Sequence, residues 1–167
     1  LPDAAPDSFY CAVNGEGDLI AAERYFQRAT RDRHLKPEER EFAKYLVEST
    51  REAKYARHAL MHLDRFDVLK EKKPRIAAES YRRFKRWFSQ NIEKLYKNVA
   101  HHLATLGPEM EKSEPDTIAF GKRALNGLSG LREGIEGRDP QEVFLTLGQA
   151  IYFEEEALRT IARRRSI

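Results

Sequence analysis

The clearest pattern in the chain lies in residues 37–63, PEEREFAKYLVESTREAKYARHALMHL. Apolar and small side chains recur there at alternating steps of four and three residues, at Phe42, Leu46, Ser49, Ala53, Ala56, Leu60 and Leu63. This spacing places them along one side of an α-helix, as in helices that pack lengthwise in a bundle. The small members Ser49, Ala53 and Ala56 would let a neighbouring helix come close. The pattern therefore predicts a long helix that begins at Pro37 and carries a bundle-packing seam.

Four other segments show a helical period, and no segment shows the alternation of a strand. A shorter helix is expected from about Asp18 to His34, and a long one from Pro74 to a stop signal at Leu106-Gly107-Pro108. Two further helices should begin near Pro115 and at Pro140. Because the connections are short, successive helices should lie antiparallel. The predicted fold class is all-α: an up-down antiparallel helical bundle of four main helices plus a shorter N-terminal helix.

The segment that begins near Pro115 contains three glycines, Gly121, Gly127 and Gly130. Each glycine weakens a helix by up to about 1 kcal/mol relative to alanine. Two interpretations explain their presence. Either another helix crosses closely at these positions, or the helix breaks near Gly127.

Length and composition limit the class of protein. The chain has 167 residues, enough for one domain with a core, and we expect an irregular lead-in over residues 1–17 and a single helical-bundle domain over residues 18–167. One Cys excludes a disulfide framework and multi-cysteine metal sites. No apolar run approaches the about 20 residues that span a bilayer, so we expect a cytoplasmic protein without membrane contact. No motif indicates a cofactor.

The net charge of +3 is unevenly distributed along the chain. Residues 65–100 contain 11 Lys and Arg against 4 Asp and Glu, a local charge of +7. Cationic side chains beside aromatic rings can contact phosphates and stack on bases. The candidate nucleic-acid-binding residues are Lys72, Lys73, Arg82, Arg83, Lys85, Arg86 and Trp87. The same pattern also describes an ordinary bundle helix whose cationic side chains surround a buried aromatic stripe, although Trp87 is the residue that this stripe explains least.

A second candidate site is the hexapeptide Arg57-His58-Ala59-Leu60-Met61-His62. His58 and His62 are four residues apart on one helix, so both rings could reach one metal ion, with His102 and Glu155 as further ligands. The alternative interpretation is structural. In it Arg57 flanks the core and both histidines point away from it.

The same hexapeptide resembles the R-x4-H signature of HEPN-domain ribonucleases, which are all-α bundles of about this size. The resemblance implies metal-independent RNA cleavage, typically at a symmetric dimer interface. It implies that Arg57 stabilises phosphate charge and that His62 serves in acid–base chemistry. These residue types suit the reaction, because imidazole titrates near neutrality and guanidinium matches phosphate geometry.

Three consecutive glutamates, Glu154-Glu155-Glu156, interrupt the apolar stripe of the last helix. A buried carboxylate needs a partner, because burying it alone is very costly. One interpretation is a carboxylate site inside the bundle, and the other is a structural glutamate paired with a cation or with a histidine such as His102.

These observations leave three hypotheses for the function. The first is a non-enzymatic helical-bundle protein that contacts nucleic acid or an acidic protein surface through its basic third helix, as a homodimer or as a small subunit of a larger assembly. The second is a HEPN-like ribonuclease that uses Arg57 and His62. The third is a bundle that holds a metal or a cofactor.

Overall fold

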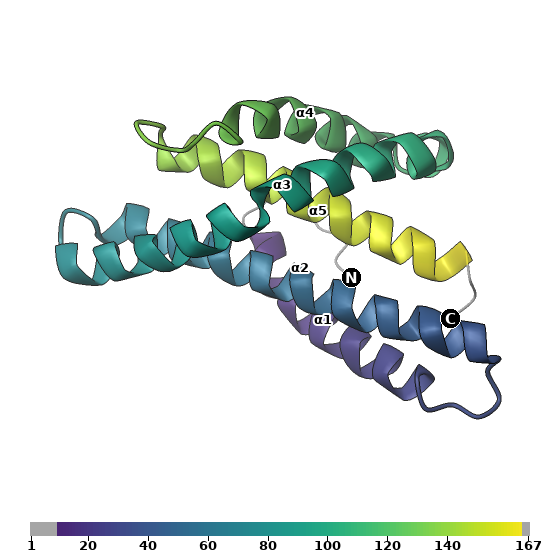
Figure 1. Cartoon of the computed structure of the whole chain (residues 1–167). Coiled ribbons are helices and arrows are strands. Elements are labelled where there is room, and N and C mark those ends of the chain that lie inside the picture. Colours follow the sequence, from purple (N-terminus) through teal and green to yellow (C-terminus); the bar gives the residue numbers. More distant parts are fainter. Residues whose placement is uncertain (1–9, 165–167) are drawn as a thin grey trace.

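The protein is an all-α helical bundle, as predicted (Figure 1). The computed structural model describes the backbone of residues 10–164 and the side chains of residues 19–164. Over these residues it contains no strand, and its helices are α1 (Tyr10–Ala29), α2 (Pro37–Leu69), α3 (Pro74–Ser113), α4 (Pro115–Leu131) and α5 (Pro140–Arg164). None of the described helices is long and apolar enough to cross a membrane.

Helix α5 lies in the middle of the bundle and packs against α2, α3 and α4 (Figure 1). Successive helices run in opposite directions, so the predicted up-down course of the chain is confirmed. Helices α2 and α3 are close together at the turn that joins them and diverge toward their other ends, where α5 lies between them. This divergence positions the candidate site described below.

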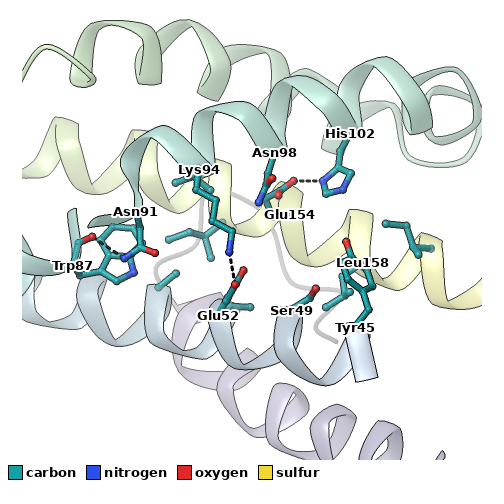
Figure 2. Close-up of a pocket in the computed structure, with 15 residues that line it drawn as sticks. Tyr45, Ser49, Glu52, Trp87, Asn91, Lys94, Asn98, His102, Glu154 and Leu158 are labelled. Atoms are coloured by element: carbon teal, nitrogen blue, oxygen red, sulfur yellow. Dashed lines mark hydrogen bonds and ion pairs between the residues drawn. The ribbon is translucent and has the colours of Figure 1, made fainter. Parts of the chain in front are cut away.

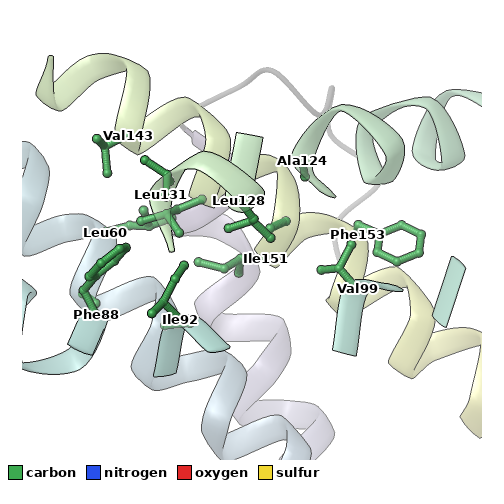
Figure 3. Packing of buried hydrophobic residues seen from close by; sticks show 14 of the residues in the cluster. Leu60, Phe88, Ile92, Val99, Ala124, Leu128, Leu131, Val143, Ile151 and Phe153 are labelled. Atoms are coloured by element: carbon green, nitrogen blue, oxygen red, sulfur yellow. The ribbon is translucent and has the colours of Figure 1, made fainter. Parts of the chain in front are cut away.

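The main hydrophobic core lies between α2, α3, α4 and α5 (Figure 3). Its members include Leu60, Phe88, Ile92, Val99, Leu128, Leu131, Ile151 and Phe153. A second, smaller cluster joins α1, α2 and the end of α5 through Phe26, Leu46, Val47, Leu158 and Ala162. The predicted seam of α2 is buried at Leu46, Ala56, Leu60 and Leu63 and therefore supplies side chains to both clusters.

The N-terminal helix has different limits from those predicted. Helix α1 begins at Tyr10, so the irregular lead-in predicted for residues 1–17 is wrong from residue 10 onward, while residues 1–9 lie outside the described residues. Gly15 and Gly17 lower helix propensity but keep their backbone N–H groups, so they weaken a helix without ending it. The helix ends at Ala29 rather than His34, and the Asp32 side chain accepts the His34 backbone N–H at 2.9 Å, a turn that competes with helix.

The stop signal predicted at Leu106-Gly107-Pro108 is also wrong. Helix α3 continues through Pro108 to Ser113. A proline inside a helix removes one backbone hydrogen bond at a cost of about 3 kcal/mol. Leu106 and Met110 are both buried in the main core, and their packing offsets this loss.

The glycines of α4 lie where α5 crosses closely. A Cβ atom added to Gly121 would lie 2.7 Å from the Phe153 ring, and one added to Gly127 would lie 2.5 Å from the Thr146 methyl group. Both distances are too short for carbon atoms in contact. The close crossing is therefore confirmed, and the helix does not break near Gly127.

We expect Gly121→Ala to destabilise the protein by about 1–3 kcal/mol, because the added methyl group overpacks the α4–α5 contact. Gly148→Ala in α5 is the matched control, since its added Cβ would meet nothing within 4 Å. There the higher helix propensity of alanine should stabilise the fold by roughly 0.5–1 kcal/mol. Urea unfolding of both variants measures the difference. A stabilised Gly121→Ala would contradict the close crossing.

Candidate functional site

A groove of about 430 Å³ runs along the line where α2 and α3 meet. We call it the α2–α3 groove, and its lining residues are Glu52, Tyr55, His58, Ala59 and His62 from α2 and Arg83, Trp87, Gln90 and Asn91 from α3. Toward the α2–α3 turn, the groove continues into a hollow of about 360 Å³ that shares His62 and Arg83 with it. This hollow adds two exposed arginines, Arg65 and Arg75. One end of the groove is therefore strongly cationic.

At its other end the groove meets a pocket of about 100 Å³ between α2, α3 and α5 (Figure 2). We call this the inner pocket; it shares Glu52, Trp87 and Asn91 with the α2–α3 groove. Ser49, Ala53 and Ala56 line it. These small residues were predicted to admit a neighbouring helix. Because α3 diverges from α2 here, they leave a space instead.

Polar pairs span the inner pocket (Figure 2). Lys94 of α3 forms an ion pair with Glu52 of α2. Nδ1 of His102 lies 2.6 Å from Oε2 of Glu154 on α5, which confirms a carboxylate of the glutamate triplet as the partner of this histidine. These contacts hold α2, α3 and α5 together around the space that their divergence leaves.

Trp87 forms the boundary between the α2–α3 groove and the inner pocket. Its half-buried ring packs against the main core, with its centroid 6.2 Å from that of Phe84. The adjoining Asn91 donates a hydrogen bond from Nδ2 to the Trp87 carbonyl at 2.8 Å. The position of Trp87 explains why the apolar stripe of α3 does not account for it, since one side of the ring belongs to the core and the other borders a cavity.

His62 lies half-buried in the wall of the α2–α3 groove. Burial lowers the pKa of this imidazole, and the neighbouring Arg83 and His58 side chains lower it further. The ring is therefore mainly uncharged at neutral pH and offers one hydrogen-bond donor and one acceptor.

Four exposed arginines, which we call the arginine face, lie along the solvent side of α3: Arg75, Arg82, Arg83 and Arg86. Glu79 lies among them and accepts hydrogen bonds from Arg82 at 2.5 Å and from Arg83 at 3.2 Å. These two guanidinium groups hold the pKa of Glu79 below its usual range.

The structure divides the predicted nucleic-acid-binding residues into separate groups. Arg82, Arg83 and Arg86 share the arginine face, and Lys72 and Lys73 are exposed in the turn that precedes it. Lys85 is also exposed, and its Nζ atom lies 4.9 Å from the centroid of the Tyr81 ring.

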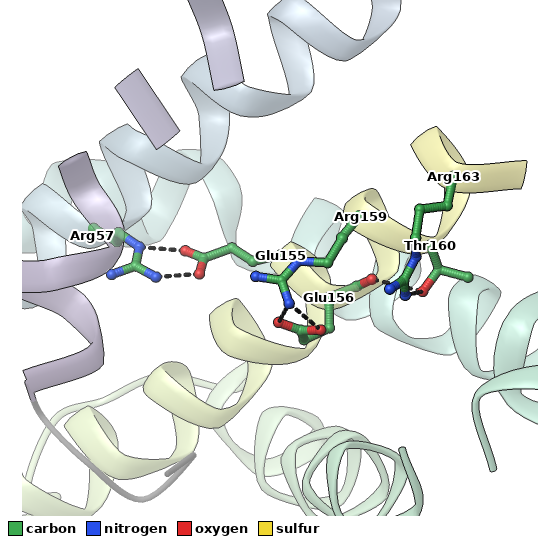
Figure 4. Close-up of polar contacts among 6 residues, drawn as sticks. All are labelled: Arg57, Glu155, Glu156, Arg159, Thr160 and Arg163. Atoms are coloured by element: carbon green, nitrogen blue, oxygen red, sulfur yellow. Dashed lines mark hydrogen bonds and ion pairs between the residues drawn. The ribbon is translucent and has the colours of Figure 1, made fainter. Parts of the chain in front are cut away.

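Arg57 and His62, which the HEPN resemblance pairs, have different neighbours in the structure. Arg57 is only 2% exposed and forms two hydrogen bonds with Glu155 of α5 (Figure 4). His62 instead lines the groove against α3. The two side chains therefore have different surroundings in this chain, and Arg57 flanks the core as a buried residue.

The four predicted metal ligands do not meet at one site. His58 and His62 both line the α2–α3 groove, whereas His102 pairs with Glu154, and Glu155 pairs with Arg57. In the described part of the chain, no group of three or more His, Cys, Asp or Glu side chains lies close enough to hold a metal ion. The predicted quartet is not formed because His102 and Glu155 pair with other residues, away from the two histidines of the groove.

Each buried glutamate of α5 has a charged neighbour (Figure 4). Burial raises the pKa of Glu155, and the Arg57 guanidinium opposes this effect. Glu156 is 2% exposed, and its Oε1 atom lies 3.3 Å from Nη1 of Arg159. Burial raises the pKa of Glu156 to about 7; Arg159 opposes this shift, and the neighbouring carboxyl of Glu114 adds to it. The interpretation of paired structural glutamates is therefore confirmed for Glu155.

Comparison of the chain with protein families, with curated proteins and with solved structures gives no match.

Tyr55, Gln90 and Asn91 line this region but are not among the residues that the sequence patterns predict. A signal was available on α3. Polar or aromatic residues recur there at steps of three and four beside the apolar stripe, at Ser80, Arg83, Trp87, Gln90, Lys94 and Asn98, and Asn91 adjoins this series. Such a second stripe predicts a side of the helix that is close to a neighbour but not sealed against it.

Replacing Arg57 with Met should cost about 3–5 kcal/mol, because Glu155 would remain buried without its cationic partner. The double variant Arg57→Met/Glu155→Leu should recover most of that stability, since neither charge is then buried. Guanidinium chloride unfolding of the two variants checks this. A near-neutral Arg57→Met would show that the ion pair is not buried as described.

The raised pKa of Glu156 predicts a pH-dependent stability. Between about pH 4.5, the ordinary value for this carboxyl, and pH 7, the folded state retains a proton that the unfolded state releases. Stability should therefore fall as the pH rises through this window and level off above it. Glu156→Gln should be more stable than the parent at pH 8, by on the order of 2–3 kcal/mol, and similar to it near pH 4.5.

Thermal unfolding across this pH range measures the effect of Glu156→Gln. Glu48→Gln, at an exposed position on α2, is the control and should leave the pH profile unchanged. An equal change in the pH dependence of stability in both variants would contradict a specific effect of Glu156.

Proposed function

We propose that this protein is a non-enzymatic helical-bundle module that binds nucleic acid through the arginine face of α3. The observation that carries the proposal is the row of exposed guanidinium groups at Arg75, Arg82, Arg83 and Arg86, with Glu79 as their only acidic neighbour between residues 75 and 86. Guanidinium groups bind phosphate oxygens in a bidentate geometry, and several together give strong, salt-dependent affinity.

The surroundings of the arginine face support the proposal. Lys72 and Lys73 in the turn and Arg65 on α2 extend the cationic surface around the end of the bundle. Arg75 and Arg86 form no ion pair with any other described residue, so their charges are available to a partner. Phosphate contacts of this kind fix the position of a nucleic acid without reading its sequence.

An acidic protein surface is the other partner that these cations would attract, as a second subunit of a hetero-assembly or within a homodimer. The alignment of several arginines along one helix favours a chain of phosphates, because successive phosphates present the same charged group at repeated intervals. We place this activity in the cytoplasm.

Fluorescence anisotropy with a labelled 20-nucleotide RNA tests the proposal. We expect binding at 50 mM salt that weakens steeply as the salt concentration rises. The triple variant Arg75→Glu/Arg82→Glu/Arg86→Glu should lose at least tenfold in affinity. The slope of log affinity against log salt should also fall by roughly 2–3, about one for each lost phosphate contact.

The matched control reverses three exposed cations elsewhere, in Lys112→Glu/Lys122→Glu/Arg123→Glu. It changes the net charge equally and should retain most of the affinity. Absence of binding at 50 mM salt, or an equal loss in both variants, would overturn the proposal. Polyglutamate that binds more tightly than RNA would instead identify an acidic protein partner.

A further inference from the structure

The α2–α3 groove differs in chemistry from the arginine face beside it. Two aromatic side chains line it from opposite helices, Tyr55 of α2 and Trp87 of α3. The side-chain amides of Gln90 and Asn91 lie beside Trp87 in the same wall. Flat rings flanked by amide donors and acceptors suit a flat ligand that has aromatic faces and a polar edge, which is the character of a nucleobase.

The Trp87 ring is held in a fixed position. It packs on Phe84 and the main core on its inner side. A ring that is already ordered loses little entropy when a ligand stacks on it. Tyr55, by contrast, is 63% exposed and free to move onto a ligand from the opposite side.

The polar groups of the groove are suited to reading the edge of a base. The Gln90 side chain forms no hydrogen bond with any other residue of the described chain, so both its donor and its acceptor are available. His62 is mainly uncharged at neutral pH and adds one donor and one acceptor. The groove volume of about 430 Å³ lies within the range of roughly 300–1,000 Å³ that is usual for small-ligand sites.

The groove and the arginine face meet at Arg83. This residue lines the groove, and it also lines the cationic hollow that contains Arg65 and Arg75. A nucleic-acid backbone held by these arginines would therefore pass the open end of the groove, with Arg83 beside the phosphate of the nucleotide that enters it.

We propose that the α2–α3 groove binds one unpaired base of a single-stranded nucleic acid, stacked on Trp87 and covered by Tyr55, while the arginine face holds the adjoining phosphates. The site rests on the proposed function, and it specifies the class of nucleic acid. A base in a duplex is paired and stacked, so only a single strand presents one that can enter the groove without an unpairing cost.

The intrinsic fluorescence of Trp87 provides a direct test, because the chain contains a single tryptophan. The full chain is titrated with a single-stranded RNA 12-mer, with the matching duplex and with inorganic polyphosphate. We expect the single strand to quench Trp87 and to bind at least tenfold more tightly than the duplex. Polyphosphate should bind without quenching, because it carries charge but no base.

Two variants separate the groove from the arginine face. Tyr55→Ala leaves the reporter in place and should weaken single-strand binding by about 5- to 150-fold, the usual range for one lost base–aromatic stack, while leaving polyphosphate binding unchanged. Trp87→Phe retains a ring and should bind the single strand within a few-fold of the parent in an anisotropy assay. Tyr25→Ala, at an exposed tyrosine on α1, is the control and should bind as the parent does.

The base site would be overturned if the single strand, the duplex and polyphosphate all bound without quenching Trp87, or if Tyr55→Ala had no effect on single-strand binding. Either result would leave the arginine face as a phosphate-binding surface. Equal affinity for the single strand and the duplex would overturn it as well. Failure of all three anions to bind at 50 mM salt would overturn both the base site and the proposed function.

Discussion

The buried ion pair between Arg57 of α2 and Glu155 of α5 constrains the rest of the bundle. Two charges removed from water must meet each other, so few relative positions of the two helices are compatible with both being buried. We expect this pair to fix the register of α5 against α2. Helix α5 then occupies the centre of the bundle, between the diverging ends of α2 and α3, and the inner pocket and the α2–α3 groove follow from that divergence.

The same helix, α3, meets two different requirements along its length. Its apolar side, with Phe84, Phe88 and Ile92, belongs to the main core, while its opposite side carries the arginine face. Trp87 lies between these two sides and contacts both the core and the groove. A cationic surface and an aromatic ring thus occur side by side because a single helix carries both. Side chains on one helix are held in position more precisely than side chains on separate loops.

Much of the fold follows from residue spacing, whereas much of the site does not. The period of Leu46, Leu60 and Leu63 predicts the α2 seam, and the structure buries all three. The helix end predicted at Pro108 was wrong because local helix propensity does not report how deeply the neighbouring side chains pack. The burial of Arg57 could not be predicted for a related reason. It depends on Glu155, 98 residues further along the chain, and no local pattern contains that partner. The groove, likewise, depends on where two helices diverge.

The division of the core into two clusters has a consequence for the cooperativity of the molecule. The described side chains of α1 contribute to the smaller cluster through Phe26, while the main core is built from α2 to α5. Detachment of α1 would expose that smaller cluster but leave the larger one closed, so it requires less free energy than global unfolding. The protein thus contains a subglobal opening unit at one edge, and its amide hydrogens can exchange with solvent while the helices that carry the groove stay folded.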